Sequence, residues 1–108
     1  MQTMPYNKDE FKTETWTTDP NNRYKIVDDL INRKLLDKKS KTEVINLLGL
    51  PSKYDDDFGF IEHIYRTDSL KKDTDLVYTI GVRPGIYQPR GHFLIFFKND
   101  TVMNYRER

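Results

Sequence analysis

The sequence predicts an α+β fold in which two N-terminal helices pack on a three- to four-stranded antiparallel β-meander. Three observations support this fold class. Residues 40–51 carry complete signals for the start and end of a helix, residues 19–32 show a second amphipathic helical pattern, and the later segments alternate or run apolar as strands do. Because the helical segments precede the strands, the sheet is expected to be antiparallel, with its strands joined as a meander.

The helix within SKTEVINLLGLP (residues 40–51) is the most clearly delimited element. Ser40 followed three residues later by Glu43 predicts a capping box, in which each side chain binds the other residue's backbone N–H. Gly49 predicts a left-handed cap, and Pro51 prevents continuation of the helix. The apolar stripe consists of Val44, Ile45, Leu47 and Leu48.

Residues 1–10 are predicted to form a flexible arm, and residues 11–108 are predicted to form a single domain. Phe11 and Trp16 are expected to pack onto the domain, because large aromatic side chains are mostly buried, or alternatively to be a partner's docking site. Asp19 and Pro20 predict the N-cap and first position of an amphipathic helix that ends near Asn32.

Four segments after residue 59 are candidate strands. Residues 60–66 (FIEHIYR) are predicted to be the first strand. Residues 75–82 alternate and are predicted to be the second, with a buried face formed by Leu76, Tyr78, Ile80 and Val82. Residues 92–98 are apolar on both faces and are predicted to be the central strand. Its second face, with Leu94 and Phe96, then needs cover from the N-terminal arm or from a partner. Residues 99–100 predict a tight hairpin turn into a last strand at 101–107.

Composition excludes several classes of function. The 108 residues suffice for one domain, and 18 Lys and Arg against 17 Asp and Glu leave a net charge of +1, so we expect no attraction to nucleic acid or to anionic membranes by bulk charge. Cysteine is absent, which excludes disulfides and thiolate chemistry. The longest apolar run, residues 93–97, is far too short to span a bilayer. The first ten residues do not resemble a secretory leader, so we expect either a cytoplasmic protein or a leader that precedes this sequence.

The sequence offers little support for catalysis, and we predict that the protein is not an enzyme and binds no cofactor. The acidic residues 55–57 lack the ligand spacing of a helix–loop–helix calcium site. No phosphate-binding glycine motif and no serine nucleophile elbow occurs. His63 and His92, expected on two strands, leave open a metal site with a carboxylate, provided that those strands pair in register.

Residues 83–91 (RPGIYQPRG) form the predicted connection between the second and third strands. Arginine and tyrosine are enriched at protein–protein interfaces, and long connections often carry function. The alternative is an ordinary surface loop. We expect a partner-binding site composed of this loop and the second face of the central strand, formed by Arg83, Tyr87, Arg90, Leu94 and Phe96.

The order of these motifs resembles the SmpA/OmlA (BamE-like) small lipoprotein superfamily and related uncharacterised small bacterial proteins. The resemblance covers most of residues 11–107 and rests chiefly on residues 41–51, with Phe11, Trp16, VYTIG, HFLIFF and TVMNY in matching order. It implies two helices on a three-stranded meander, an envelope protein held by a lipidated cysteine, and an accessory role in assembling outer-membrane β-barrels. Two copies of this architecture in tandem would be similar to the architecture of β-lactamase inhibitor proteins. Because this sequence lacks cysteine, the implied anchor is expected only in a leader.

Two functions of different classes follow. The first is a non-enzymatic protein-binding or scaffold module of the bacterial cell envelope, which contacts another protein through its sheet face and the 83–91 loop; an inhibitor or immunity protein for a cognate enzyme is a special case. The second is a small metal-dependent hydrolase that uses His63 and His92.

Overall fold

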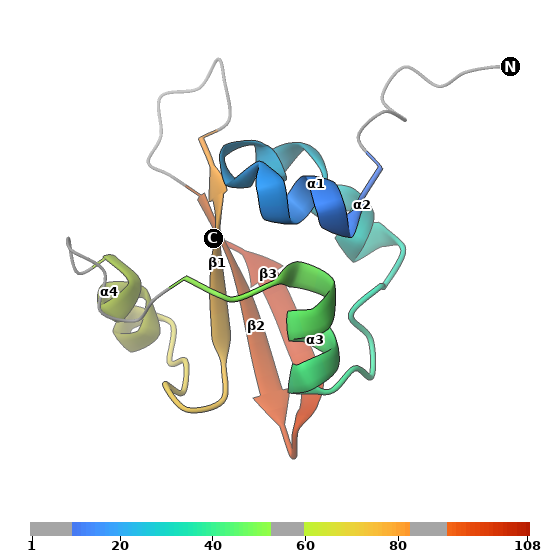
Figure 1. Ribbon diagram of the computed structural model, residues 1–108. Helices are drawn as coiled ribbons and strands as arrows, with labels where there is room; N and C mark the ends of the chain where they lie inside the picture. Colours follow the sequence, from blue (N-terminus) through green and yellow to red (C-terminus); the bar gives the residue numbers. More distant parts are fainter. Residues whose placement is uncertain (1–9, 53–59, 83–90) are drawn as a thin grey trace, which may run out of the picture.

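The computed structural model describes residues 10–52, 60–82 and 91–108, with the side chain of Phe60 left aside, and has an α+β fold. A three-stranded antiparallel sheet lies between two helical layers (Figure 1). The N-terminal segments α1 (Thr13–Thr18), η2 (Pro20–Lys25), α2 (Val27–Asn32) and α3 (Lys41–Leu48) cover one face, and α4 (Phe60–Thr67) covers the other.

The sheet is the predicted meander, with the order β1 (Leu76–Gly81), β2 (Gly91–Lys98) and β3 (Thr101–Glu107). β2 is the central strand, as predicted from its two apolar faces. Asn99 and Asp100 form the hairpin turn with φ values of 53° and 61°, which short polar side chains tolerate and which matches the twist of the flanking strands. Val82, predicted to continue the buried face of β1, lies beyond its end and is exposed.

Phe11 and Trp16 are buried in the main core, as the sequence predicts. Trp16 is fully buried and packs against Phe11, Tyr78 and Phe93, with ring centroids 5.8–6.2 Å apart. The segment that carries it is a short helix, α1, where the sequence shows no helical period. The prediction of a flexible arm for residues 1–10 lies outside the described residues, except for Glu10.

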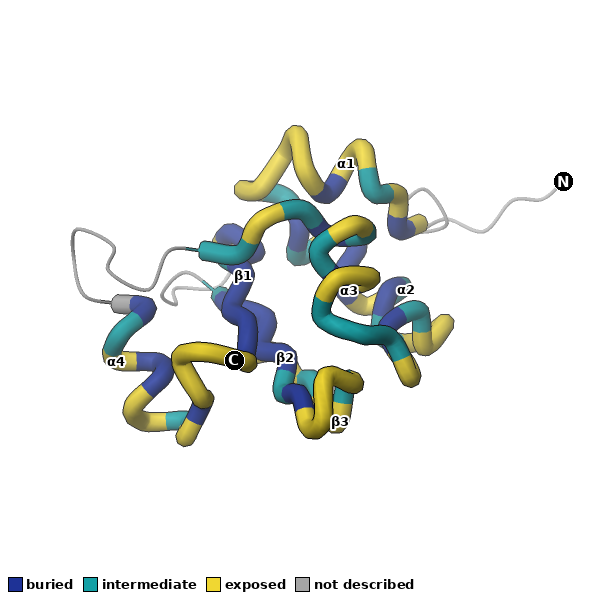
Figure 2. The backbone as a smooth tube through the Cα atoms, turned by 60° about the horizontal axis from the view of Figure 1, so that its bottom comes forward, coloured by how far each residue is buried: buried dark blue, intermediate teal, exposed yellow. Residues whose placement is uncertain are grey.

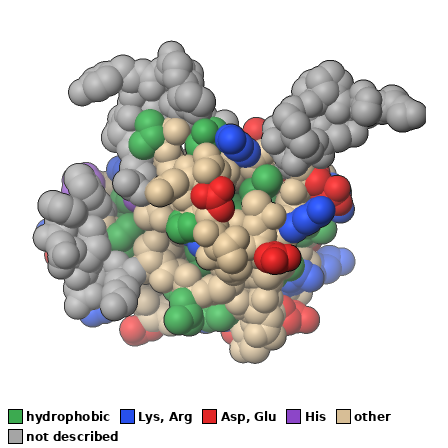
Figure 3. All heavy atoms as spheres, turned by 45° about the horizontal axis from the view of Figure 1, so that its top comes forward, with side chains coloured by type: hydrophobic (Ala, Val, Ile, Leu, Met, Phe, Trp, Pro, Cys, Tyr) green, Lys and Arg blue, Asp and Glu red, His purple; other side chains and the backbone are tan. Residues whose placement is uncertain are grey.

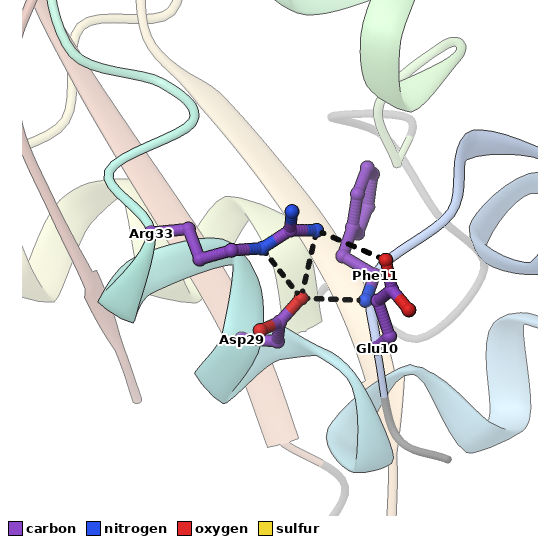
Figure 4. A network of polar contacts seen from close by, with 4 residues as sticks. All are labelled: Glu10, Phe11, Asp29 and Arg33. Carbon is purple, nitrogen blue, oxygen red and sulfur yellow. Dashed lines mark hydrogen bonds and ion pairs between the residues drawn. The ribbon is translucent and has the colours of Figure 1, made fainter. Parts of the chain in front are cut away.

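A polar network holds the start of the described chain against α2 (Figure 4). The Asp29 carboxylate accepts a hydrogen bond from the Phe11 backbone N–H at 2.8 Å and pairs with the Arg33 guanidinium at 3.0 Å. Glu10 approaches the same guanidinium at 3.9 Å. Such exposed ion pairs contribute little free energy, so this network directs Phe11 toward the core while burial of its ring supplies most of the stabilisation.

The helix predicted at residues 19–32 is broken into η2 and α2, with non-helical backbone at Asn22 and Ile26. Asp19 does not cap the helix; its carboxylate accepts hydrogen bonds from the Asn22 side chain at 2.9 and 3.0 Å. The break brings Arg23 into the interior, where its Nε donates to the Trp16 carbonyl at 2.7 Å. Amphipathic spacing alone does not reveal this break, since both halves keep apolar residues on the core side.

α3 begins and ends where the sequence predicts. The Ser40 hydroxyl accepts a hydrogen bond from the Glu43 N–H at 3.2 Å, and the Glu43 carboxylate accepts one from the Ser40 N–H at 2.8 Å. Gly49 follows with φ of 78°, which favours glycine. Val44 and Leu48 are fully buried, and Ile45 and Leu47 pack beside them.

The prediction of a first strand at residues 60–66 is wrong, because this segment forms α4. Ile61, Ile64 and Tyr65 follow helical spacing and are buried, and with Leu70 they cover a second apolar cluster on the far face of the sheet. Leu94 lies in this cluster and is fully buried. The expectation that the arm or a partner covers Leu94 is therefore also wrong, since α4 covers it.

We expect Gly81→Ala to destabilise the fold by at least about 2 kcal/mol, measured as the free energy of unfolding in urea. Gly81 has φ of 91°, and a Cβ there would overlap the carbonyl group of Asn21 on η2. Gly91→Ala is the matched control, because its Cβ would meet the flexible Ile80 side chain at 3.1 Å and the Gly81 carbonyl oxygen at an ordinary 3.4 Å, so its effect should be clearly smaller. Equal stabilities of the two variants would contradict the close approach of η2 to β1.

Candidate functional site

The structure describes two of the five residues of the predicted partner-binding site. Arg83, Tyr87 and Arg90 lie outside the described residues. Leu94 is fully buried beneath α4 and offers no surface to a partner, whereas Phe96 is half-buried on the same face, with the Arg106 guanidinium 5.2 Å from its ring centroid. The sheet face is thus closed at Leu94 and partly accessible near Phe96.

The two histidines lie on different kinds of element. His63 is an exposed residue of α4, not of a strand, and His92 is buried on β2. Paired strands were the condition for a shared metal site, and that condition is not met. Across the described ranges, no group of three or more His, Cys, Asp or Glu side chains is arranged to hold a metal ion.

The outer edge of β1 is covered by other parts of the chain. The Ser52 N–H donates to the Val77 carbonyl at 2.8 Å, and the Ser52 hydroxyl accepts from the Thr79 N–H at 3.2 Å. Arg23 donates to the Thr79 carbonyl at 3.0 Å. Because backbone groups on an uncovered edge are a template for another strand, these contacts close β1 to a further strand.

The outer edge of β3 is covered only at its start, among the residues that the structure describes. There the Val102 N–H donates to the Lys39 carbonyl at 2.9 Å, and Ser40 forms a bridge with Thr101. No further strand follows β3 in the described sheet. Figure 2 shows the contrast, with β1 and β2 largely buried and β3 largely exposed. We call residues 103–107 the open edge.

Tyr105 directs its backbone N–H and carbonyl away from β2. His92 and Arg108 exchange both backbone hydrogen bonds, at 3.2 and 2.7 Å. Because hydrogen-bonded and non-hydrogen-bonded pairs alternate along an antiparallel ladder, the pairs Leu94–Arg106 and Phe96–Asn104 also face inward, and Tyr105, opposite Ile95, faces outward. The centre of the open edge therefore presents one outward donor and one outward acceptor.

A β-bulge marks the start of the open edge. β3 pairs Val102 with Phe97 and Asn104 with Phe96, so Met103 is an extra residue without a partner on β2. Its side chain is 59% exposed, one of the few large apolar side chains on the described surface. Bulges often adjoin functional sites, because they re-aim a side chain or end a pairing.

Charged and aromatic side chains flank the open edge on both faces of the sheet. On the side of the N-terminal helices, the Tyr105 hydroxyl donates to the Asp37 carboxylate at 2.6 Å, and the Tyr105 ring packs against Phe93. On the α4 side, Arg106 and Arg108 both pair with Asp68, the former at 3.3 Å. These contacts fix the side chains that a bound segment would meet.

The face turned toward α1 offers no comparable feature. On its coloured part, acidic and basic side chains are interspersed and hydrophobic side chains are scattered (Figure 3). Leu50 is 81% exposed after α3, but a single exposed leucine is ordinary on a protein surface. The open edge of β3 is therefore the strongest candidate site.

β3 lies where the sequence predicts the last strand, but nothing in its residues predicts a functional role. Its residues, TVMNYRE, are largely polar and resemble any solvent-facing strand. Only the order of the strands and the cover on β1 show that this edge is left open.

In comparisons with known proteins, no family model and no curated protein matches the chain. Nor does any described helix combine the length and apolar character that a membrane span requires.

We expect Asp37→Asn to lower the pKa of Tyr105. Burial, followed by the hydrogen bond to Asp37, raises the pKa of Tyr105 from 10.0 to about 12. This raised pKa stabilises the folded chain below pH 10, and that stabilisation is lost as the pH rises toward about 12. In the variant the pKa should fall but stay above 10.0, because burial remains. NMR titration of ¹³C-labelled tyrosine measures it.

Asp73→Asn is the matched control, because Asp73 is an exposed carboxylate away from Tyr105 and its loss should leave that titration unchanged. An unchanged pKa of Tyr105 in Asp37→Asn would contradict the close approach of the Asp37 carboxylate to the Tyr105 hydroxyl.

Proposed function

We propose that the protein is a protein-binding module that takes up an extended segment of another protein molecule along the open edge of β3. The observation that carries this proposal is the asymmetry of the sheet. Ser52 and Arg23 cover the edge of β1, whereas Tyr105 on β3 directs its backbone groups outward. Strand addition uses such an edge: backbone hydrogen bonds supply affinity, and alternate side chains supply specificity.

The side chains beside the edge define what the added segment would contact. On the α4 side it would meet the half-exposed guanidinium of Arg106, and on the side of the N-terminal helices it would meet the ring of Tyr105. Exposed Met103 adds an adaptable apolar contact at the start of the edge. A segment that alternates polar or acidic residues with apolar residues suits this surface.

We propose that the 83–90 connection contacts the same partner. It joins the end of β1 to the start of β2, and Arg108, directly after β3, is hydrogen-bonded to His92 near that start. A segment that runs along the open edge therefore reaches the end of the sheet from which this connection leaves. Arg83, Tyr87 and Arg90 remain predicted partner contacts, and a cognate enzyme is one kind of partner.

We expect photo-crosslinking amino acids at positions 104 and 106 to form adducts with a protein in cells of the source organism. Both side chains lie on the same side of β3, two residues apart. Strand addition predicts that their attachment points, mapped by mass spectrometry, lie two residues apart in one extended segment of the partner.

The same probe at Thr15 is the control, because Thr15 is exposed on α1, away from the edge. No adduct at either edge position, equal labelling from Thr15, or attachment points scattered over the partner would refute the proposal. Adducts with the chain itself and with other proteins both satisfy it.

We also propose that the protein acts in the bacterial cell envelope, and the sequence resemblance alone supports this location. Fractionation of the source cells should then recover the native protein with membranes or periplasm. Recovery with a cytoplasmic marker would contradict the location without affecting the proposal for the open edge.

A further inference from the structure

We infer that the open edge of β3 binds a second copy of this chain, so that two sheets join antiparallel about a two-fold axis at Tyr105. This inference rests on the proposed function and names the partner of the same edge. It follows from three features of β3: the direction of its backbone groups, the position of the Lys39 contact, and the order of its side chains.

The backbone of Tyr105 has the polarity that a two-fold axis requires. In an antiparallel pair, a residue on the axis faces its own copy, and the two either exchange both hydrogen bonds or exchange none. Because Tyr105 directs its N–H and carbonyl outward, it can donate to and accept from Tyr105 of the second copy. The two tyrosine side chains then form a cross-strand aromatic pair, which is a favourable contact in sheets.

The Lys39 contact limits the possible registers. An axis at Tyr105 places Met103 opposite Glu107 of the second copy, so that the overlap covers residues 103–107 and stops before Val102. An axis at Asn104 would instead place Arg106 opposite Val102, whose outer side is already bound to the Lys39 carbonyl. The register centred on Tyr105 therefore uses the whole open edge and leaves the Lys39 contact in place.

The charges of β3 disfavour the next register along the strand. An axis at Arg106 would place two guanidinium groups directly opposite each other, and like charges in that position are destabilising. With the axis at Tyr105, each Arg106 instead faces Asn104 of the other copy. Asp68 engages part of the Arg106 guanidinium, which has five N–H donors, so donors remain for the Asn104 carbonyl oxygen.

The local charge at this position predicts how a charged residue at position 104 would act. The guanidinium groups of Arg106 and Arg108 share a single side-chain carboxylate, Asp68, so basic side chains are in excess beside Asn104 of the second copy. A glutamate at that position would be attracted, and an arginine would be repelled. Because the two-fold axis repeats the contact between positions 104 and 106, each effect occurs twice in the dimer.

The test compares the dimerisation of the wild-type chain with that of Asn104→Glu and Asn104→Arg by sedimentation equilibrium across a concentration series at low salt. The wild type should form a concentration-dependent dimer. Asn104→Glu should tighten the dimer and Asn104→Arg should weaken it, each by about 2- to 30-fold in Kd, from two cross-strand charge pairs. Both differences should shrink in high salt.

Thr15→Glu and Thr15→Arg are matched controls that make the same charge changes on α1 and should leave the Kd unchanged. Asn104 is exposed, so both variants should fold, and thermal unfolding checks this. An independent measurement uses the wild type alone: the Tyr105 amide should exchange with deuterium more slowly as the protein concentration rises.

A wild type that stays monomeric at millimolar concentration, or shifts of the same sign in both Asn104 variants, would overturn the inference. The proposed function would survive that result if crosslinking at positions 104 and 106 labels a different protein at two sites that lie two residues apart in one segment. If crosslinking labels no protein and the chain is monomeric, both proposals fail.

Discussion

The buried guanidinium of Arg23 connects the N-terminal helical layer to the sheet. Its Nε binds the Trp16 carbonyl at 2.7 Å, one terminal nitrogen binds the Thr79 carbonyl at 3.0 Å, and its carbon lies 4.8 Å from the Trp16 ring centroid and 5.9 Å from that of Tyr78. Burial lowers the pKa of Arg23 below its ordinary value, and nearby Tyr78 opposes this shift. The contact fixes Trp16 in the core and, together with Ser52, closes the edge of β1, so that the open edge of the sheet lies on β3.

Elements with local signals were predictable from the sequence. The Ser40–Glu43 capping box and the turn at Asn99 and Asp100 depend on residues within a few positions of one another, and the structure confirms both. α4 was missed because its apolar residues fit two periods: Ile61 and Tyr65 belong equally to an alternating strand and to a helix. The second apolar face of β2 decides between them, since it needs a broad cover and one helix side supplies it.

The candidate site depends on contacts that no local pattern encodes. The sequence shows that Tyr105 alternates with its neighbours, but not that Lys39 stops covering β3 just before Met103 or that Ser52 covers β1. These are relations between segments far apart in the chain. Residues 83–91 attracted the prediction because their composition is distinctive, whereas the open edge is distinguished only by its neighbours.

The sheet separates the apolar interior into two unequal clusters. The larger contains Trp16, Tyr78 and Phe93 and joins every N-terminal helix, whereas the smaller, beneath α4, shares with it only the strands on which Val77 and Leu94 lie. Among the described residues, apolar contact between the two clusters therefore runs through the strands. We therefore expect two tiers of stability, in which α4 detaches in a sub-global opening while the principal core stays folded.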